Sequence, residues 1–269
     1  MSIDNSTKTP IVFIHGLWLH AESWSNWINF FRANSYNAVA ASWPGDAETT
    51  EATRKNATAI AGYGVTEIAD HIAGQLKAFA KPPILIGHSF GGLLVQNLLG
   101  RDLAAAAIAI DPAPIKGVPE LPLSALKSAF PFLGNPFNFN RAVSQSEQQF
   151  RFGFTNAVPE QEARELYVKY AMPAPARPLF QVATATFNPN AATKVNVANA
   201  TRGPLLLVSG AEDNTVPPLL VRSTLKAYRN SPAVTEIKEF AGRGHSLTID
   251  SGWRELAEYC LAWLQAKGL

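Results

Sequence analysis

Short apolar runs alternate with longer amphipathic stretches along most of this chain, and that alternation leaves few folds open. The stretch from Val65 to Phe79 repeats apolar residues at the spacing of one helix face. Apolar runs separated by helical stretches are typical of a parallel sheet with helices on both faces, so the sequence predicts an α/β fold. The predicted strands are Ile11 to His15, Asn37 to Ala41, Ile84 to Ile86, Ala104 to Ile110, Leu205 to Ser209 and Val234 to Phe240. The predicted helices are Trp24 to Phe31, Val65 to Phe79, Leu93 to Leu99, Pro218 to Tyr228, and a last helix around Trp253 to Leu264 with Asp250 or Ser251 as its N-cap.

The alternation stops in the middle of the chain. The segment 112–203 holds 11 of the 19 prolines and 9 of the 15 phenylalanines. Helices are expected at Glu160 to Ala171 and Arg177 to Ala183, and the rest of the segment has no strand signal. The strand pattern returns at Pro204. We therefore expect a core formed by residues 1–111 and 204–269, with 112–203 inserted as a helical, loop-rich unit.

Composition and charge exclude several classes of protein. The 23 Lys and Arg residues nearly balance the 21 Asp and Glu residues, so there is no electrostatic footprint for nucleic acid. One cysteine excludes an internal disulfide, and the five scattered histidines form no metal-ligand motif. No apolar run approaches the roughly 18 residues of a membrane span, and Met1 to Pro10 has no hydrophobic signal region. The expectation is a soluble cytoplasmic protein without metal, cofactor, nucleic-acid or membrane partner.

One motif suggests chemistry. Gly87-His88-Ser89-Phe90-Gly91 is a G-x-S-x-G sequence between a predicted buried strand and a predicted helix. A sharp turn there would raise the hydroxyl of Ser89 above the strand ends, next to the backbone N–H groups of a helix start. An ordinary glycine-rich strand-to-helix turn is the alternative. A serine nucleophile also needs a base and an orienting acid elsewhere in the chain.

With these pieces the chain resembles the α/β-hydrolase family, as a serine esterase with a cap insertion. The matching segments follow in the order of that family and span nearly the whole chain: His15-Gly16-Leu17-Trp18, the Ser89 motif, Gly210 to Pro217, and Gly242-Arg243-Gly244-His245-Ser246. The resemblance implies about six parallel strands. Because few residues precede Ile11, we expect the antiparallel strands that often open this fold to be missing.

The resemblance also implies residue roles. Ser89 matches the nucleophile, His245 the general base and Asp213 the acid. The backbone N–H groups of Phe90 and Leu17 match the oxyanion hole. Three alternatives remain: Trp18 for Leu17, and Asp111 or Glu212 for Asp213.

The remaining histidines and the cysteine are expected to have structural roles. His15 is expected to brace the oxyanion loop and His88 to make a structural hydrogen bond. His20 and His71 are expected at the surface or an edge, and Cys260 in the core.

The substrate implied by the resemblance is a neutral, fairly apolar carboxylic ester or lactone with a short-to-medium acyl or aryl group. No Arg or Lys cluster marks a charged substrate. Trp18, Trp43, Phe90, Phe137 and Phe139 are candidates for the pocket. The other phenylalanines of the insertion are further candidates for an apolar roof: Phe130, Phe132, Phe150, Phe152, Phe154, Phe180 and Phe187.

Other chemistries of the same fold stay open. A serine at the turn argues against dehalogenases and epoxide hydrolases of this fold, which use a carboxylate nucleophile. The same triad would also suit a carbon–carbon bond hydrolase, a lyase or a perhydrolase. A small-molecule receptor with little turnover is the remaining alternative, and the sequence does not separate it from an enzyme.

Overall fold

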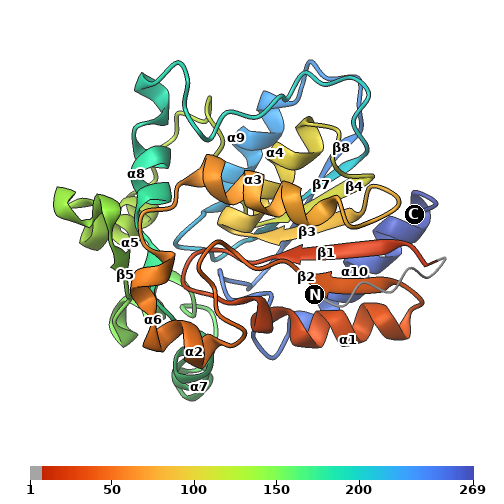
Figure 1. Ribbon diagram of the computed structural model, residues 1–269. Helices are drawn as coiled ribbons and strands as arrows, with labels where there is room; N and C mark the ends of the chain where they lie inside the picture. The colour runs from red at the N-terminus through yellow and green to blue at the C-terminus, as the bar shows by residue number, and fades with distance from the viewer. Residues whose placement is uncertain (1–7) are drawn as a thin grey trace.

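A six-stranded parallel sheet lies at the centre of the computed structural model, which describes residues 8–269. The strands are β1 (Pro10–Ile14), β2 (Asn37–Ala40), β3 (Ile84–His88), β4 (Ala106–Ile110), β7 (Leu205–Gly210) and β8 (Thr235–Phe240). Their order in the sheet is β2-β1-β3-β4-β7-β8 (Figure 1). This confirms the predicted α/β fold with about six parallel strands.

Two of the sequence predictions concern the first residues of the chain. Within residues 8–269 no strand precedes β1, as expected from the short stretch before Ile11. The expectation that Met1 to Pro10 holds no signal region lies mostly outside the described residues.

Side chains alternate between the two faces of the sheet and build two cores. In β1, Val12 and Ile14 face the side covered by α3 (Val65–Leu76), α4 (Phe90–Gly100) and α9 (Pro218–Ala227). Ile11 and Phe13 face α1 (Ser25–Ala33) and α10 (Trp253–Ala266) on the other side (Figure 1). All four side chains are fully buried. Burial on both faces holds the strand ends rigidly in place below the loops that follow them.

Helix ends differ from the sequence predictions at several places. Helix α3 ends at Leu76 rather than Phe79, and α4 begins at Phe90 rather than Leu93. The predicted N-cap of the last helix is wrong, because Gly252 occupies that position without a side-chain cap. Asp250 instead accepts a hydrogen bond from Arg243, at 2.5 Å.

Residues 112–203 form small elements at the carboxyl ends of the strands, on the left of Figure 1. The elements are α5 (Leu123–Leu133), η3 (Pro136–Asn140), β5 (Ala142–Val143), α6 (Glu147–Gly153), α7 (Glu160–Tyr170), β6 (Ala174–Pro175), α8 (Arg177–Ala183) and η4 (Ala185–Phe187). Helices α7 and α8 lie where they were expected. The absence of strands was predicted wrongly, because β5 and β6 form a small antiparallel pair. Two residues are too few to show an alternating pattern.

Hydrogen bonds tie this insertion to the loops above the sheet. The indole N–H of Trp18 donates to the carbonyl of Val143, and the N–H of Met172 donates to the carbonyl of Trp18. The N–H of Ser246 donates to the carbonyl of Phe154. Three short elements outside the insertion, η1 (Ala21–Trp24), α2 (Thr50–Lys55) and η2 (Ala57–Ile60), complete the fold.

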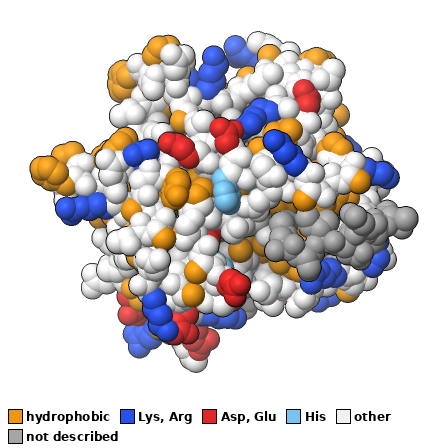
Figure 2. All heavy atoms as spheres, viewed as in Figure 1, with side chains coloured by type: hydrophobic (Ala, Val, Ile, Leu, Met, Phe, Trp, Pro, Cys, Tyr) orange, Lys and Arg blue, Asp and Glu red, His pale blue; other side chains and the backbone are white. Residues whose placement is uncertain are grey.

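The surface is mixed in charge on the face shown in Figure 2, where basic and acidic side chains are interspersed. Apolar side chains stand out at the left edge, where Figure 1 places α5. Leu123 and Phe130 of that helix are largely exposed. None of the helices in residues 8–269 is long and apolar enough to cross a membrane.

Candidate active site

Ser89 lies at a sharp turn between β3 and α4, with a backbone conformation rare for a residue with a side chain. Its φ is 56° and its ψ is −119°. The turn is held on both sides: the N–H of Ser89 donates to the carbonyl of Ile110, and its carbonyl accepts from the N–H groups of Leu93 and Ala113. Such a conformation costs about 1–3 kcal/mol and persists only where the surroundings enforce it.

Glycine is required on both sides of Ser89. A Cβ atom on Gly87 would lie 2.2 Å from the carbonyl oxygen of Gly91, and one on Gly91 would lie 2.1 Å from the carbonyl oxygen of Ile14. Both obstacles are backbone atoms of central elements, which cannot move aside cheaply. The two glycines therefore allow the tight approach of α4 to the sheet.

We expect Gly91→Ala to lower the free energy of unfolding by about 3 kcal/mol, a drop of roughly 6–12 °C in Tm, because the methyl group would overlap the β1 backbone. Gly74→Ala is the matched control. Gly74 lies in α3, and a Cβ atom added there would meet nothing within 4 Å, so alanine is expected to stabilise the helix by about 0.5–1 kcal/mol. Thermal unfolding of both variants measures the difference. Equal Tm values would contradict the packing described here.

His245 and Asp213 form a buried pair at the carboxyl ends of β8 and β7. Nδ1 of His245 lies 2.5 Å from Oδ2 of Asp213. The other carboxylate oxygen, Oδ1, accepts the backbone N–H groups of Thr215 at 2.7 Å and Val216 at 2.8 Å. These three contacts fix the position of the Asp213 carboxyl group beside the imidazole ring.

The other face of the imidazole is packed and its second nitrogen is unpaired. The ring of His245 lies 4.5 Å from that of His88 and 4.6 Å from that of Phe154, between ring centres. Nε2 of His245 has no hydrogen-bond partner among the described residues. Because His88 directly precedes Ser89, the unpaired nitrogen belongs to a ring packed beside the serine turn.

Asp111 is a second buried carboxyl group next to this pair. Its Oδ2 lies 3.9 Å from Nδ1 of His245, which is farther than Asp213 and too long for a hydrogen bond. Its Oδ1 accepts the N–H of Gly210. Burial and the nearby Asp213 carboxylate raise the pKa of Asp111 well above its usual range. The raised pKa favours the protonated form of Asp111. Glu212, the other alternative acid, is exposed.

We expect Asp111→Asn to stabilise the protein more as pH rises. A raised pKa in the folded state gives stability that is present below the unfolded pKa of about 3.9 and lost toward the folded pKa. Between these two pKa values the free energy of unfolding falls by about 1.4 kcal/mol per pH unit. Asparagine has the shape of the aspartic acid side chain but does not titrate, so the variant does not show this fall. Tm values at about pH 4 and pH 8 measure the effect. A difference in Tm that does not change with pH would contradict the raised pKa of Asp111.

The loop after β1, which carries Leu17, lies against the Ser89 turn. Gly16 lies so close that a Cβ there would be 2.7 Å from the Cβ of Ser89, which brings the loop after β1 against the serine. Within residues 8–269, no carbonyl accepts the N–H of Leu17 or Phe90. In this part of the chain both N–H groups are therefore without a backbone acceptor.

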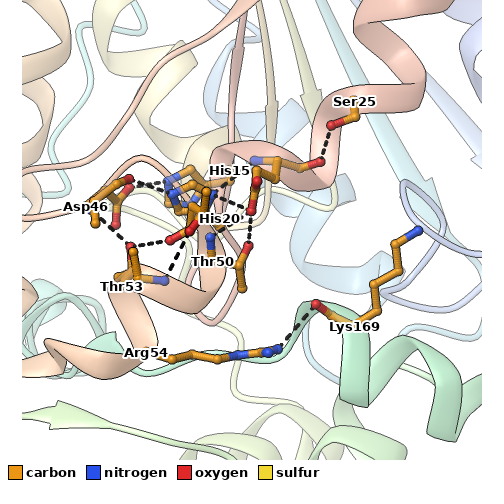
Figure 3. A network of polar contacts seen from close by, with 12 residues as sticks. His15, His20, Ser25, Asp46, Thr50, Thr53, Arg54 and Lys169 are labelled. Atoms are coloured by element: carbon orange, nitrogen blue, oxygen red, sulfur yellow. Dashed lines mark hydrogen bonds and ion pairs between the residues drawn. The ribbon is translucent and has the colours of Figure 1, made fainter.

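A network of polar contacts joins the loop after β1 to the loop that follows β2 (Figure 3). His15 places Nε2 at 3.1 Å from Oδ2 of Asp46 and Nδ1 at 2.9 Å from the carbonyl of Gly16. His20 donates from Nε2 to the carbonyl of Ala47. Burial alone would raise the pKa of Asp46, but the hydrogen bond and charge of His15 and the N–H of Trp43 lower it. Asp46 is therefore an ionised anchor for His15.

Of the predictions for the two histidines in this loop, one is confirmed and the other is wrong. His15 contacts the loop as predicted, whereas His20 is buried rather than at the surface. Burial and the neighbouring His15 lower the pKa of His20. Sequence reasoning missed Asp46, which follows the turn at Pro44-Gly45; its position after the second strand was the available signal.

Ser89 opens into a cavity of about 130 Å³ under the insertion. Trp18 and Phe90 line it, as expected. The structure does not bring Trp43, Phe137 or Phe139 there. Trp43 stacks on His15 behind the loop, and Phe137 and Phe139 are exposed. The cavity walls are mostly aliphatic: Leu121, Ala125, Leu126, Ala129, Leu133, Leu179, Val182, Val216 and Leu220.

None of the nine phenylalanines of the insertion lines the cavity. Phe154 packs against His245, and Phe132 packs against Trp18. Phe130 and Phe187 are exposed. These phenylalanines support the site or face solvent, because α5 and α8 present their smaller side chains to Ser89.

The remaining histidines and the cysteine are readily placed. His71 is exposed and Cys260 is buried in the core, as expected. Neither ring nitrogen of His88 has a hydrogen-bond partner within residues 8–269, so the structure does not show the expected structural hydrogen bond. His88, Asp111 and His245 offer ligand atoms within 4.8 Å of one another. A metal would need an ionised Asp111, and the raised pKa of that carboxyl group disfavours the ionised form.

Comparisons with known proteins agree with this architecture. Residues 11–259 match the sequence model of the alpha/beta hydrolase family. No curated protein sequence matches the chain. The structure resembles a monoacylglycerol lipase from Paleococcus ferrophilus, with a TM-score of 0.65 at 20% identity over 96% of this chain and 95% of that one.

Two plant structures are similar as well. A methylesterase from Arabidopsis has a TM-score of 0.64 at 17% identity, covering 96% of this chain and 99% of that one. Tomato methylketone synthase I, in complex with 2-tridecanone, has a TM-score of 0.70 at 13% identity, covering 97% and 99%. At these identities the solved structures establish the fold alone.

Proposed function

The chain belongs to the alpha/beta hydrolase family, and we propose that it is a serine hydrolase that cleaves carboxylic esters through an acyl-enzyme on Ser89. The observation that carries this proposal is the strained position of Ser89 at an apolar cavity, beside the His245–Asp213 pair. We propose that residues 112–203 act as a cap over this cavity.

In the proposed mechanism, Ser89 attacks the ester carbonyl while Nε2 of His245 accepts the hydroxyl proton. Asp213 holds the imidazole in the required orientation and stabilises its cationic form. The N–H groups of Leu17 and Phe90 bind the oxyanion. The alcohol leaves with the proton that His245 had accepted. His245 then activates a water molecule, and this water hydrolyses the acyl-enzyme. These steps need no metal or cofactor.

The cavity supports a small, neutral acyl or aryl group. An apolar cavity of roughly 150 Å³ holds a benzene-sized ligand, so about 130 Å³ suits a short acyl chain or a small ring. The lining includes no Lys or Arg side chain. A substrate carboxylate or phosphate would therefore find no counter-charge there.

Hydrolysis of p-nitrophenyl esters from acetate to decanoate tests the proposal. We expect steady turnover with an optimum at short chains and a kcat/KM at least roughly tenfold lower for decanoate than at the optimum. An initial burst without continued turnover would favour a receptor. Absence of any reaction would favour carbon–carbon cleavage or a lyase, for which ketonic substrates are the next test.

A further inference from the structure

Two polar side chains in the wall of the Ser89 cavity have buried oxygen atoms that no group satisfies. They are Oε1 of Gln145 and Oε2 of Glu120, which have no donor among the described residues. The other polar side chains of the wall differ. Thr215 donates to the carbonyl of Gly153 at 2.9 Å, and Ser128 donates to the carbonyl of Asn214 at 3.4 Å.

Gln145 is held firmly in its place. Two residues before it, the carbonyl of Val143 accepts the indole N–H of Trp18. The hydroxyl of Tyr167 donates to the backbone carbonyl of Gln145 itself. Ser146, the next residue, caps α6 and shares a reciprocal pair of hydrogen bonds with Gln149. The backbone around Gln145 is thus fixed on both sides, and its side chain is buried, since only 6% of the residue is exposed.

Glu120 lies on the loop between β4 and α5. No Lys, Arg or His of the described residues forms an ion pair with it. A carboxylate oxygen without a cation or a donor in the wall of a mostly aliphatic cavity favours a ligand that brings a donor. An amide or carboxylate left unpaired in this way is costly, whereas one that pairs with a substrate group selects for that group.

We propose that the substrates of this site are esters that carry a hydroxyl group, which the side chains of Gln145 and Glu120 bind inside the cavity. This inference rests on the proposed ester hydrolysis at Ser89 and narrows its substrate class. A hydroxyl group supplies one donor, which can pair with one of the two unpaired oxygen atoms. A methyl group at the same place has about the same size but supplies no hydrogen-bond donor.

Pairs of methyl esters that differ only by a hydroxyl in place of a methyl group test the proposal. Suitable pairs are methyl lactate with methyl isobutyrate, and methyl β-hydroxybutyrate with methyl isovalerate. We expect the hydroxylated member of at least one pair to have a kcat/KM higher by about tenfold to a hundredfold. In Gln145→Met and in Glu120→Met the ratio of kcat/KM for the hydroxylated ester to kcat/KM for the methyl-bearing ester is expected to fall by at least about fivefold.

Gln148→Met is the matched control. Gln148 is exposed on α6, three residues beyond Gln145, and does not line the cavity. The same substitution there should leave the preference intact. The proposal is overturned if the wild-type protein prefers no hydroxylated ester, or if both cavity variants keep the wild-type preference.

Binding separates this proposal from the proposed function. Calorimetric titration of Ser89→Ala with both members of each pair measures the preference without turnover. Tighter binding of the hydroxylated ester, weakened by Gln145→Met, supports the polar site even if no ester is hydrolysed. Equal binding of both members, together with active hydrolysis, overturns this inference and leaves the ester hydrolase proposal standing.

Discussion

Ser89→Ala is expected to lower kcat/KM for p-nitrophenyl butyrate by about 10⁵-fold to 10⁶-fold. In the proposed mechanism this hydroxyl forms the acyl bond, and alanine leaves the rest of the site in place. The residual rate would come from the two N–H donors and substrate binding alone, which accelerate hydrolysis modestly over water. Serine and alanine both carry a Cβ, so alanine meets the same backbone strain at the φ of 56° that serine already adopts.

The control for this experiment is another serine. Ser223 lies buried in α9 and does not line the cavity. Ser223→Ala is expected to keep the wild-type kcat/KM. Initial rates of p-nitrophenolate release measure both variants. A Ser89→Ala protein that retains more than about a tenth of wild-type activity would remove Ser89 from the mechanism.

Asp213→Asn is expected to lower kcat by about 10⁴-fold with little change in fold. The amide cannot stabilise the imidazolium, and its NH₂ group would favour the wrong tautomer of His245. The neighbouring Asp111 offers a direct comparison, because both carboxyl groups lie near Nδ1 of His245, at 2.5 Å and 3.9 Å. The raised pKa of Asp111 favours its neutral form, so Asp111→Asn, which introduces a neutral amide, should retain kcat within about tenfold.

The two variants decide which carboxylate serves the histidine. Single-turnover rates and the pH profile of kcat/KM measure both. If Asp111→Asn abolished activity and Asp213→Asn retained it, Asp111 would be the acid, and the present assignment would be wrong.

The order of strands and helices could be predicted because its signal is local and repeated. Each central strand is an apolar run buried on both faces, and each helix between them has one apolar side. The turn at Ser89 was also predictable. Close backbone contacts require glycine at positions 87 and 91, and these two glycines are part of the G-x-S-x-G motif.

The details of the cavity depend on contacts between distant segments and were not predictable. Phenylalanines in the insertion suggested an aromatic roof, but composition does not tell which side of α5 or α8 faces Ser89. His20 was expected at the surface or an edge, but it is buried. Its burial depends on the distant loop that carries Asp46 and Ala47, which the sequence around His20 does not reveal. The pair β5 and β6 is too short for any periodic signal.

Mass spectrometry of acid-quenched samples during turnover of p-nitrophenyl butyrate tests the acyl-enzyme most directly. We predict a butyryl group on the peptide that contains Ser89 while substrate remains, and its disappearance once the substrate is exhausted. Turnover without this adduct, or with a butyryl group on another residue that decays at the turnover rate, would contradict the mechanism proposed here.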